Sequence, residues 1–172
     1  MGEETILLVE DNPNDEILTV RALKKIGLAG EQIAVARDGV EALDHLFGAS
    51  ASRRSLPRLV LLNLKLPKMD GLEVLRRLRA DERTRLLPVV ILTSSREQHN
   101  MIDCQLADGW ILRGVDFDLF TREVDRLRPL LKGDPPERRA NLMASLRRRF
   151  PQETPCGRGS RRSVSVAGVE RR

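Results

Sequence analysis

Short apolar runs alternate with amphipathic segments along residues 4–131. Continuous apolar runs of strand length occupy residues 5–9, 33–36, 59–62, 88–92 and 110–112. Helical patterns lie between them, after residue 12 through 27, over 38–47, after residue 71, and over 116–131. Strands that are apolar throughout are typical of a parallel sheet that helices cover on both faces. The alternation therefore predicts an α/β fold with five strands.

Helix signals support these boundaries. Asn12 and Pro13 supply cap and first-turn chemistry for the first helix, and Asp38 is placed to cap the second. In the helix after residue 71 the apolar face carries Leu72, Leu75 and Leu78, and the opposite face carries Arg76, Arg77 and Arg79. We therefore expect these three arginines to face solvent.

Polar side chains stand at or just past the ends of four predicted strands. They are Glu10 and Asp11, Asn63, Thr93, and Arg113. A parallel sheet binds ligands outside the carboxyl ends of its strands. The pattern therefore predicts that these side chains meet at one edge of the sheet.

These positions carry a resemblance to a known family. Residues 59–71 read LVLLNLKLPKMDG, which resembles the centre of a response-regulator receiver domain. The same family has an acidic pair after the first strand, a Thr or Ser after the fourth, and an aromatic residue on the fifth; here these are Glu10–Asp11, Thr93 and Trp110. The resemblance covers about residues 4–131. It implies a flavodoxin-like, doubly wound sheet and a role in two-component (phosphorelay) signalling.

The resemblance also implies the role of each site residue. The phosphoacceptor position falls on Asn63, whose amide cannot form the acyl phosphate that the family's aspartate forms. In the family the two acidic residues, the acceptor and one backbone carbonyl hold Mg²⁺; by position these are Glu10, Asp11, Asn63 and the carbonyl of Lys65. Because one anionic ligand is lost, we expect Mg²⁺ binding to be weak or lost.

Two further residues depart from the family pattern. Arg113 stands where the family has a lysine, and a guanidinium is not a geometric substitute for an ammonium. We expect Arg113 to pair with Asp11 or Glu10. Gly114 stands where the family has a cis proline, so the preceding bond is expected to be trans. Three departures around one site favour natural degeneration over a single laboratory substitution at Asn63.

Two site-lining residues have alternative interpretations. Thr93 is either the family's switch hydroxyl or an ordinary side chain at a strand end. Trp110 stands at the position of the family's switch aromatic, and we expect a fixed packing role for it here.

The last 41 residues differ in composition from the rest of the chain. Residues 132–172 carry 11 Lys and Arg against 4 Asp and Glu, whereas residues 1–131 are slightly acidic. The segment 133–136, Gly-Asp-Pro-Pro, ends the last helix. The sequence thus predicts a receiver domain over 1–132 and a basic extension over 133–172, with a short helix at 137–150 and disorder beyond it.

The expected function follows from these points. We expect a cytoplasmic, single-domain receiver that is not an enzyme, has no membrane segment, and signals by phosphorylation-independent protein contacts. Expected partners are a histidine kinase or another receiver, and homodimerisation through the last helix is a further possibility. A basic loop at 48–57 resembles one in small regulators that partner phytochrome-type kinases. Two alternatives stay open: a phosphorelay receiver with Asp11, Glu10 or Ser94 as acceptor, and a nucleic-acid-binding regulator that uses the Arg-rich tail.

Overall fold

Five parallel strands form the centre of the molecule. The computed structural model describes residues 5–48, 55–94, 106–114, 116–133 and 135–148. The strands are β1 (Ile6–Val9), β2 (Ile33–Ala36), β3 (Leu59–Asn63), β4 (Val89–Thr93) and β5 (Gly109–Leu112), in the order β2-β1-β3-β4-β5. Ile6 lies opposite Ile33 on one side and Leu59 on the other. The predicted flavodoxin-like sheet is confirmed.

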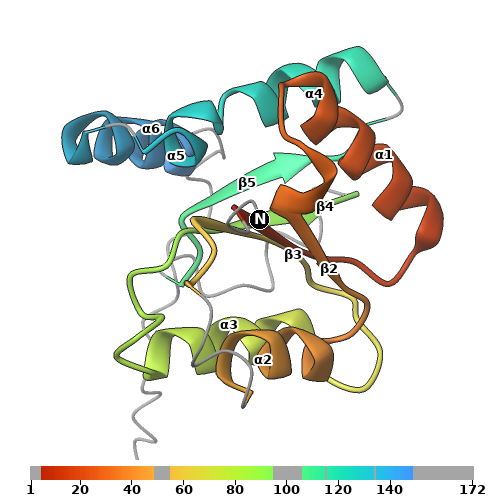
Figure 1. Cartoon of the computed structure of the whole chain (residues 1–172), viewed down its shortest axis with the longest axis vertical. Coiled ribbons are helices and arrows are strands. Elements are labelled where there is room, and N and C mark those ends of the chain that lie inside the picture. Colours follow the sequence, from red (N-terminus) through yellow and green to blue (C-terminus); the bar gives the residue numbers. More distant parts are fainter. Residues whose placement is uncertain (1–4, 49–54, 95–105, 115, 134, 149–172) are drawn as a thin grey trace, which may run out of the picture.

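Helices cover both faces of this sheet (Figure 1). Helices α2 (Gly39–Phe47) and α3 (Gly71–Ala80) lie on one face. Helices α1 (Pro13–Lys25), α4 (Phe117–Asp125), α5 (Arg128–Leu131) and α6 (Pro136–Arg148) lie on the other, and a short 3₁₀ turn, η1 (Gly30–Gln32), precedes β2. Alternate strand residues enter two separate cores: Leu7 packs on the α2–α3 side, and Ile6 and Leu8 pack on the α1–α4 side.

The helices begin at the predicted caps. The side chain of Asn12 accepts the backbone N–H of Asn14 at 2.9 Å, and Pro13 opens α1. Asp38 accepts the N–H of Glu41 at 2.8 Å at the start of α2. Each cap satisfies a backbone N–H that has no partner within its helix.

The last predicted helix is divided, so the prediction of one helix over 116–131 was wrong. The chain leaves the α-helix after Asp125 and resumes as α5 at Arg128. Pro129 explains the break, since it has no N–H to donate and its ring would collide with the carbonyl four residues earlier. The N–H of Leu130 instead joins the carbonyl of Leu127 at 2.9 Å.

Arg79 corrects a second prediction. It was expected on the solvent face of α3, but its side chain is only 16% exposed. The guanidinium donates to the carbonyls of Leu106 at 2.8 Å and Leu87 at 2.9 Å, and to the carboxylate of Asp108 at 2.7 Å. It therefore joins α3 to the segments that lead into β4 and β5.

Helix α6 packs against the core that α1 and α4 cover. Leu146 is fully buried, and Leu142 and Met143 pack against the same core. A Cβ atom placed on Gly109 of β5 would lie 2.7 Å from Cβ of Leu146, so the helix approaches where the strand has no side chain. Arg126 also donates to the hydroxyl of Ser145 at 3.0 Å. The boundary after residue 132 stays a prediction, and residues 149–172 lie outside the described part of the chain.

Candidate functional site

The carboxyl ends of the strands bring the expected residues to one edge of the sheet. Glu10 follows β1, Asn63 ends β3, Thr93 ends β4 and Arg113 follows β5. Ladder hydrogen bonds extend past the strand ends: the N–H of Glu10 donates to Ala36 at 2.9 Å, and that of Arg113 donates to Thr93 at 2.7 Å. The backbone on either side of the site is therefore held by the sheet itself.

The Asn63 amide is the centre of the site. Its nitrogen donates to Glu10 at 3.0 Å, to Asp11 at 3.2 Å and to the carbonyl oxygen of Lys65 at 3.3 Å. Its oxygen accepts the N–H of Lys65 at 3.3 Å. Three acceptors lie around the nitrogen and share its two N–H groups, and one donor faces the oxygen, so this orientation of the amide matches donors to acceptors. The four groups expected at the acceptor and metal positions thus meet at one point.

Glu10 is the buried carboxylate of the site, with no solvent-exposed surface. One oxygen accepts from Asn63 and also from the N–H of Asn12 at 3.1 Å, and the other pairs with Arg113. Burial raises the pKa of Glu10, while the charge of Arg113 and the N–H of Asn12 act to lower it. Both oxygens therefore have donors, which a buried carboxylate requires.

Arg113 supplies the positive charge. Its side chain is 11% exposed and pairs with Glu10 and, at 3.2 Å, with Asp15. The sequence predicts Asp11 or Glu10 as the partner of Arg113. The structure shows Glu10 in this role, with Asp15 as a second partner. Asp15, in the first turn of α1, was not among the expected site residues. The bond before Gly114 is trans.

The loop between β3 and α3 positions Lys65. The N–H of Gly71 donates to the carbonyl of Leu64 at 2.9 Å, and a side chain at Gly71 would collide with the carbonyl oxygen of Asn63. Lys68, in the left-handed conformation with φ of 61°, forms an ion pair with Asp38. This pairing lowers the pKa of Asp38. The loop is thereby anchored to the start of α2.

The remaining expected residues lie around this centre. Thr93 is buried at the end of β4, and Ser94, next in the chain, is exposed. Trp110 is 6% exposed and packs in the core on the α2–α3 side. A switch role for Thr93 and a fixed packing role for Trp110 stay predictions.

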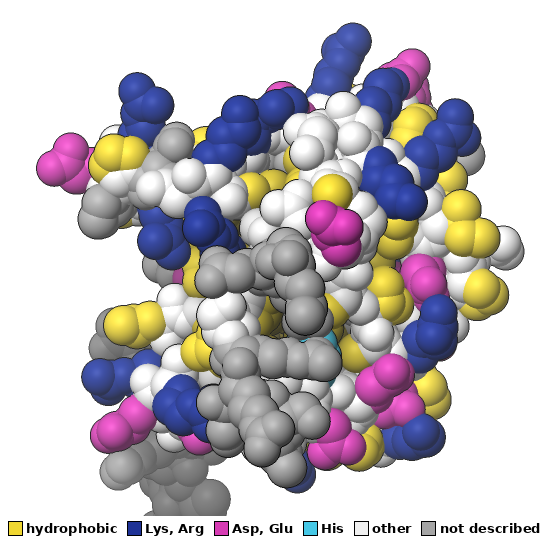
Figure 2. Space-filling view, in the orientation of Figure 1, with side chains coloured by type: hydrophobic (Ala, Val, Ile, Leu, Met, Phe, Trp, Pro, Cys, Tyr) yellow, Lys and Arg dark blue, Asp and Glu magenta, His cyan; other side chains and the backbone are white. Residues whose placement is uncertain are grey.

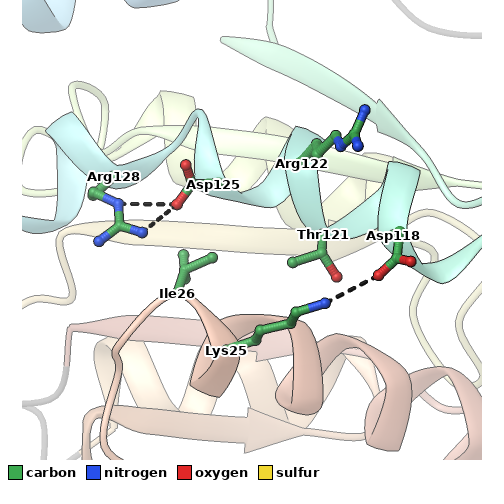
Figure 3. Close-up of a pocket in the computed structure, with 7 residues that line it drawn as sticks. All are labelled: Lys25, Ile26, Asp118, Thr121, Arg122, Asp125 and Arg128. Atoms are coloured by element: carbon green, nitrogen blue, oxygen red, sulfur yellow. Dashed lines mark hydrogen bonds and ion pairs between the residues drawn. The ribbon is translucent and has the colours of Figure 1, made fainter.

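A second surface feature is a groove between α1 and α4 (Figure 3). Lys25 and Asp118 form an ion pair across it at 3.0 Å, and Arg128 pairs with Asp125 along its far wall. Ile26, Thr121 and Arg122 complete the lining. In the same orientation as Figure 1, Figure 2 shows Lys and Arg side chains over the layer of α1 and α4, with Asp and Glu among them. No helix among the described residues is long and apolar enough to cross a membrane.

The amide nitrogen of Asn63 lies where the oxygens at the expected metal positions converge. The oxygens of Glu10, Asp11 and Lys65 that converge on one point already accept the amide N–H groups of Asn63, whose own oxygen faces Lys65. The part of the chain that the structure describes has no group of three or more His, Cys, Asp or Glu side chains suited to a metal ion. Mg²⁺ requires oxygen ligands at about 2.0–2.1 Å in octahedral geometry, so its binding here requires the Asn63 amide to turn its oxygen toward these groups. Weak or lost Mg²⁺ binding stays a prediction.

A parallel sheet with acidic side chains beyond β1 and an acceptor position at the end of β3 defines a receiver-type α/β domain. A family model for the response regulator receiver domain matches residues 6–111. The chain belongs to this family and is a receiver-domain response regulator of two-component signalling. Proteins of this family interact with histidine kinases and other signalling proteins.

Individual relatives show how close the likeness is. The chain is 39% identical over 125 residues to the probable methanogenesis regulatory protein FilR2 of Methanothrix harundinacea, a match that spans 72% of this chain and 80% of that protein. The solved bacteriophytochrome response regulator AtBRR is 42% identical with a TM-score of 0.61, over 77% of this chain and 94% of its own. The manganese-bound form of response regulator Rcp1 is 29% identical with a TM-score of 0.63, over 73% of this chain and 92% of its own.

Proposed function

We propose that this receiver signals without phosphorylation at the acceptor position, through protein contacts made in one fixed conformation. The observation that carries the proposal is the Asn63 amide, which stands at the end of β3 and donates to Glu10, Asp11 and the carbonyl of Lys65. Phosphoryl transfer to a receiver needs a carboxylate oxygen as nucleophile, and an amide does not supply one. The scaffold of the site is kept while its nucleophile is replaced.

Neighbouring groups are poor replacements for that nucleophile. Glu10 is fully buried and both of its oxygens accept hydrogen bonds. Asp11 and Ser94 are exposed, and they are the alternative acceptors that remain. One oxygen of Asp11 accepts from Asn63, which lowers its availability as a nucleophile. A phosphorelay role through either residue is therefore the second outcome of the experiment below.

We propose helix α1 as the partner surface. Ile17 is 64% exposed and Leu18 is 42% exposed on this helix, although both are large and apolar. Exposed apolar side chains of this kind supply binding energy when a partner buries them. The cation–π contacts of Arg21 and Lys25 with Phe117, at 4.9 and 5.5 Å, together with the Lys25–Asp118 pair, hold α1 against α4 as one rigid unit.

The proposed partner is a histidine kinase of the phytochrome type. The likeness to bacteriophytochrome response regulators, which extends to 42% identity, supports this choice. A second receiver, or a second copy of this chain, is the alternative partner of the same kind. The groove beside α1 carries both signs of charge, with Lys25 and Arg128 facing Asp118 and Asp125, which favours a protein partner over a polyanion. Nucleic-acid binding by the tail concerns residues outside the described part and stays a prediction.

Intact-mass spectrometry after incubation with acetyl phosphate and Mg²⁺ tests the central claim. We expect no phosphoryl adduct on the unaltered chain. The Asn63→Asp variant restores the carboxylate and tests whether the scaffold supports the chemistry. An adduct on the unaltered chain that survives Asn63→Ala would overturn the proposal and place the acceptor at Asp11 or Ser94.

A binding assay with a purified phytochrome-type histidine kinase tests the surface. We expect Ile17→Glu to weaken binding at least about tenfold, because a charge replaces an anchoring apolar contact. Leu86→Glu is the matched control: Leu86 is 84% exposed and follows α3 on the other side of the sheet. Equal affinity of both variants would contradict the assignment of α1, and failure to bind any kinase or receiver would contradict the partner class.

A further inference from the structure

We infer that the Asn63 amide and the Arg113 guanidinium together take the place of the divalent cation, so that the site holds its shape without metal. This inference deepens the proposed function, since it names what fixes the conformation on which that function rests. Relatives in the family do bind metal, as the manganese-bound Rcp1 structure illustrates. The expected difference in metal binding between this chain and its relatives therefore comes from residues of this chain. Substitutions at those residues test it directly.

The position of the amide nitrogen is the first observation. It lies 3.0 Å from Glu10, 3.2 Å from Asp11 and 3.3 Å from the carbonyl oxygen of Lys65. These three oxygens are ones that a receiver metal would need, and the two N–H bonds of the amide serve them instead. For a cation to enter, the amide would have to turn its oxygen inward, which breaks these contacts and the bond from the Lys65 N–H.

The charge balance is the second observation. A divalent cation in a receiver offsets the acceptor carboxylate as well as the acidic pair. An amide at position 63 removes one negative charge, so less positive charge is required. The positive charge at position 113, which the family's lysine also carries, is here paired to the second oxygen of Glu10 and to Asp15 at 3.2 Å. With Arg113 11% exposed and Glu10 fully buried, this pair is shielded from solvent and is weakened little by salt.

Asn63 and Arg113, two of the departures from the family pattern, contact opposite oxygens of the Glu10 carboxylate. Asn63 donates to one oxygen of Glu10 and Arg113 to the other. Glu10 is thereby fixed from both sides, and it has no free oxygen to turn toward a metal. A single guanidinium nitrogen of Arg113 reaches both Glu10 and Asp15, and Arg113→Lys keeps the positive charge while it restores the family's residue at this position. Both residues must therefore be changed to return the site fully to a metal-binding form.

Thermal unfolding of the full-length protein in EDTA, Mg²⁺ and Mn²⁺ tests this inference. Four proteins are compared: the unaltered chain, Asn63→Asp, the double variant Asn63→Asp with Arg113→Lys, and Asn141→Asp. The last makes the same charge change on the exposed surface of α6. We expect the melting temperature of the unaltered chain and of Asn141→Asp to be the same with and without either metal.

The variants that restore the site should respond to metal. At a metal concentration about ten times the dissociation constant, the melting temperature should rise by about 3–6 °C. We expect the double variant to respond most, because Glu10 is then free to turn. Binding of Mn²⁺ measured by calorimetry gives a second readout that does not depend on the variants having equal stability in EDTA.

The outcomes are distinct. Metal that stabilises the unaltered chain as much as Asn63→Asp overturns the inference, and so does a double variant that binds Mn²⁺ no better than the unaltered chain. Neither result bears on phosphorylation, which the mass measurement reports separately. A phosphoryl adduct on the unaltered chain would instead contradict the proposed function, whatever the result of the metal titration.

Discussion

The side-chain nitrogen of Asn63 lies 3.0 Å from a carboxylate oxygen of Glu10, and the two residues stand at the ends of neighbouring strands. An aspartate at position 63 would place its carboxylate beside the buried carboxylate of Glu10. The two negative charges would repel each other unless a cation lay between them. The amide turns this repulsion into a hydrogen bond. The same substitution that removes the nucleophile therefore also strengthens the folded state in the absence of metal.

Replacing Asn63 by alanine should show this contribution. The variant removes the hydrogen bonds that Asn63 donates to Glu10, Asp11 and the Lys65 carbonyl, and a hydrogen bond to a charged group contributes about 1.5–3 kcal/mol. Urea unfolding should give a loss of this size in the free energy of unfolding. Asn141→Ala, on the exposed surface of α6, is the control and should change it by no more than about 0.5 kcal/mol. Equal losses would show that the Asn63 contacts contribute nothing.

Replacing Arg113 by methionine should be more damaging. The change leaves Glu10 buried without its opposite charge, and loss of one member of a buried ion pair costs about 3–5 kcal/mol. Adding Glu10→Gln should recover part of this loss, because a neutral amide tolerates burial better than an unpaired carboxylate. The measurement is a double-mutant cycle by denaturant unfolding. Strict additivity of the two changes would contradict the coupling.

Arg79 should be required for stability although it lies far from the chemistry. Arg79→Lys keeps the charge but cannot serve two carbonyls and the Asp108 carboxylate at once, so we expect a loss of about 1–3 kcal/mol. Arg77→Lys is the matched control, since Arg77 is exposed and pairs with Glu73 one helical turn away. That change should cost less than about 0.5 kcal/mol. A similar loss of stability at both positions would contradict the role of Arg79 in joining α3 to the segments that lead into β4 and β5.

The Lys68–Asp38 pair should give a pH dependence at low pH. The hydrogen bond from Lys68 holds the pKa of Asp38 below its ordinary value. The folded state therefore prefers ionised Asp38; this contribution is full above the unfolded pKa and is lost as pH falls through the lower, folded value. NMR titration of Lys68→Met should show the pKa of Asp38 moving back up. Lys132→Met, on the far side of the molecule after α5, should leave it unchanged.

Gly109 should be necessary for the seating of α6. A methyl group there would lie 2.7 Å from Cβ of Leu146, and overpacking of this kind costs about 1–3 kcal/mol. Gly109→Ala should reduce hydrogen-exchange protection of the amides in α6. Leu146→Ala leaves that Cβ in place but removes the rest of the side chain, so the double variant should lose less than the two single losses added together. Unchanged protection in Gly109→Ala would show that α6 does not depend on this contact.

The strands and the edge at which the site lies could be predicted from the sequence. Continuous runs of Val, Ile and Leu mark strands buried on both faces, and parallel strands end at the same edge of a sheet. The meeting of Glu10 and Asn63 follows from this alone. The division of the last helix was also visible in principle, because Pro129 lies within the predicted span. The apolar periodicity continues across this proline and predicts one helix, although the proline marks a break.

Other features could not be predicted, since they depend on how elements are oriented rather than on where they lie. Asp15 reaches Arg113 because the first turn of α1 faces the end of β5, which no local pattern encodes. Arg79 lies on the arginine-rich side of α3, yet the chain folds back over it through Leu106 and Asp108. In both cases a charged side chain that the sequence pattern assigns to solvent is enclosed by segments distant along the chain.

The contact between Gly109 and Leu146 also provides a marker for comparing receivers. A side chain at position 109 would weaken the packing of α6 on β5 in this chain, because the Cβ atom of Leu146 already lies against this position. A glycine in the fifth strand together with a leucine late in the extension is therefore the pattern that we expect in a receiver whose extension completes the hydrophobic core as it does here.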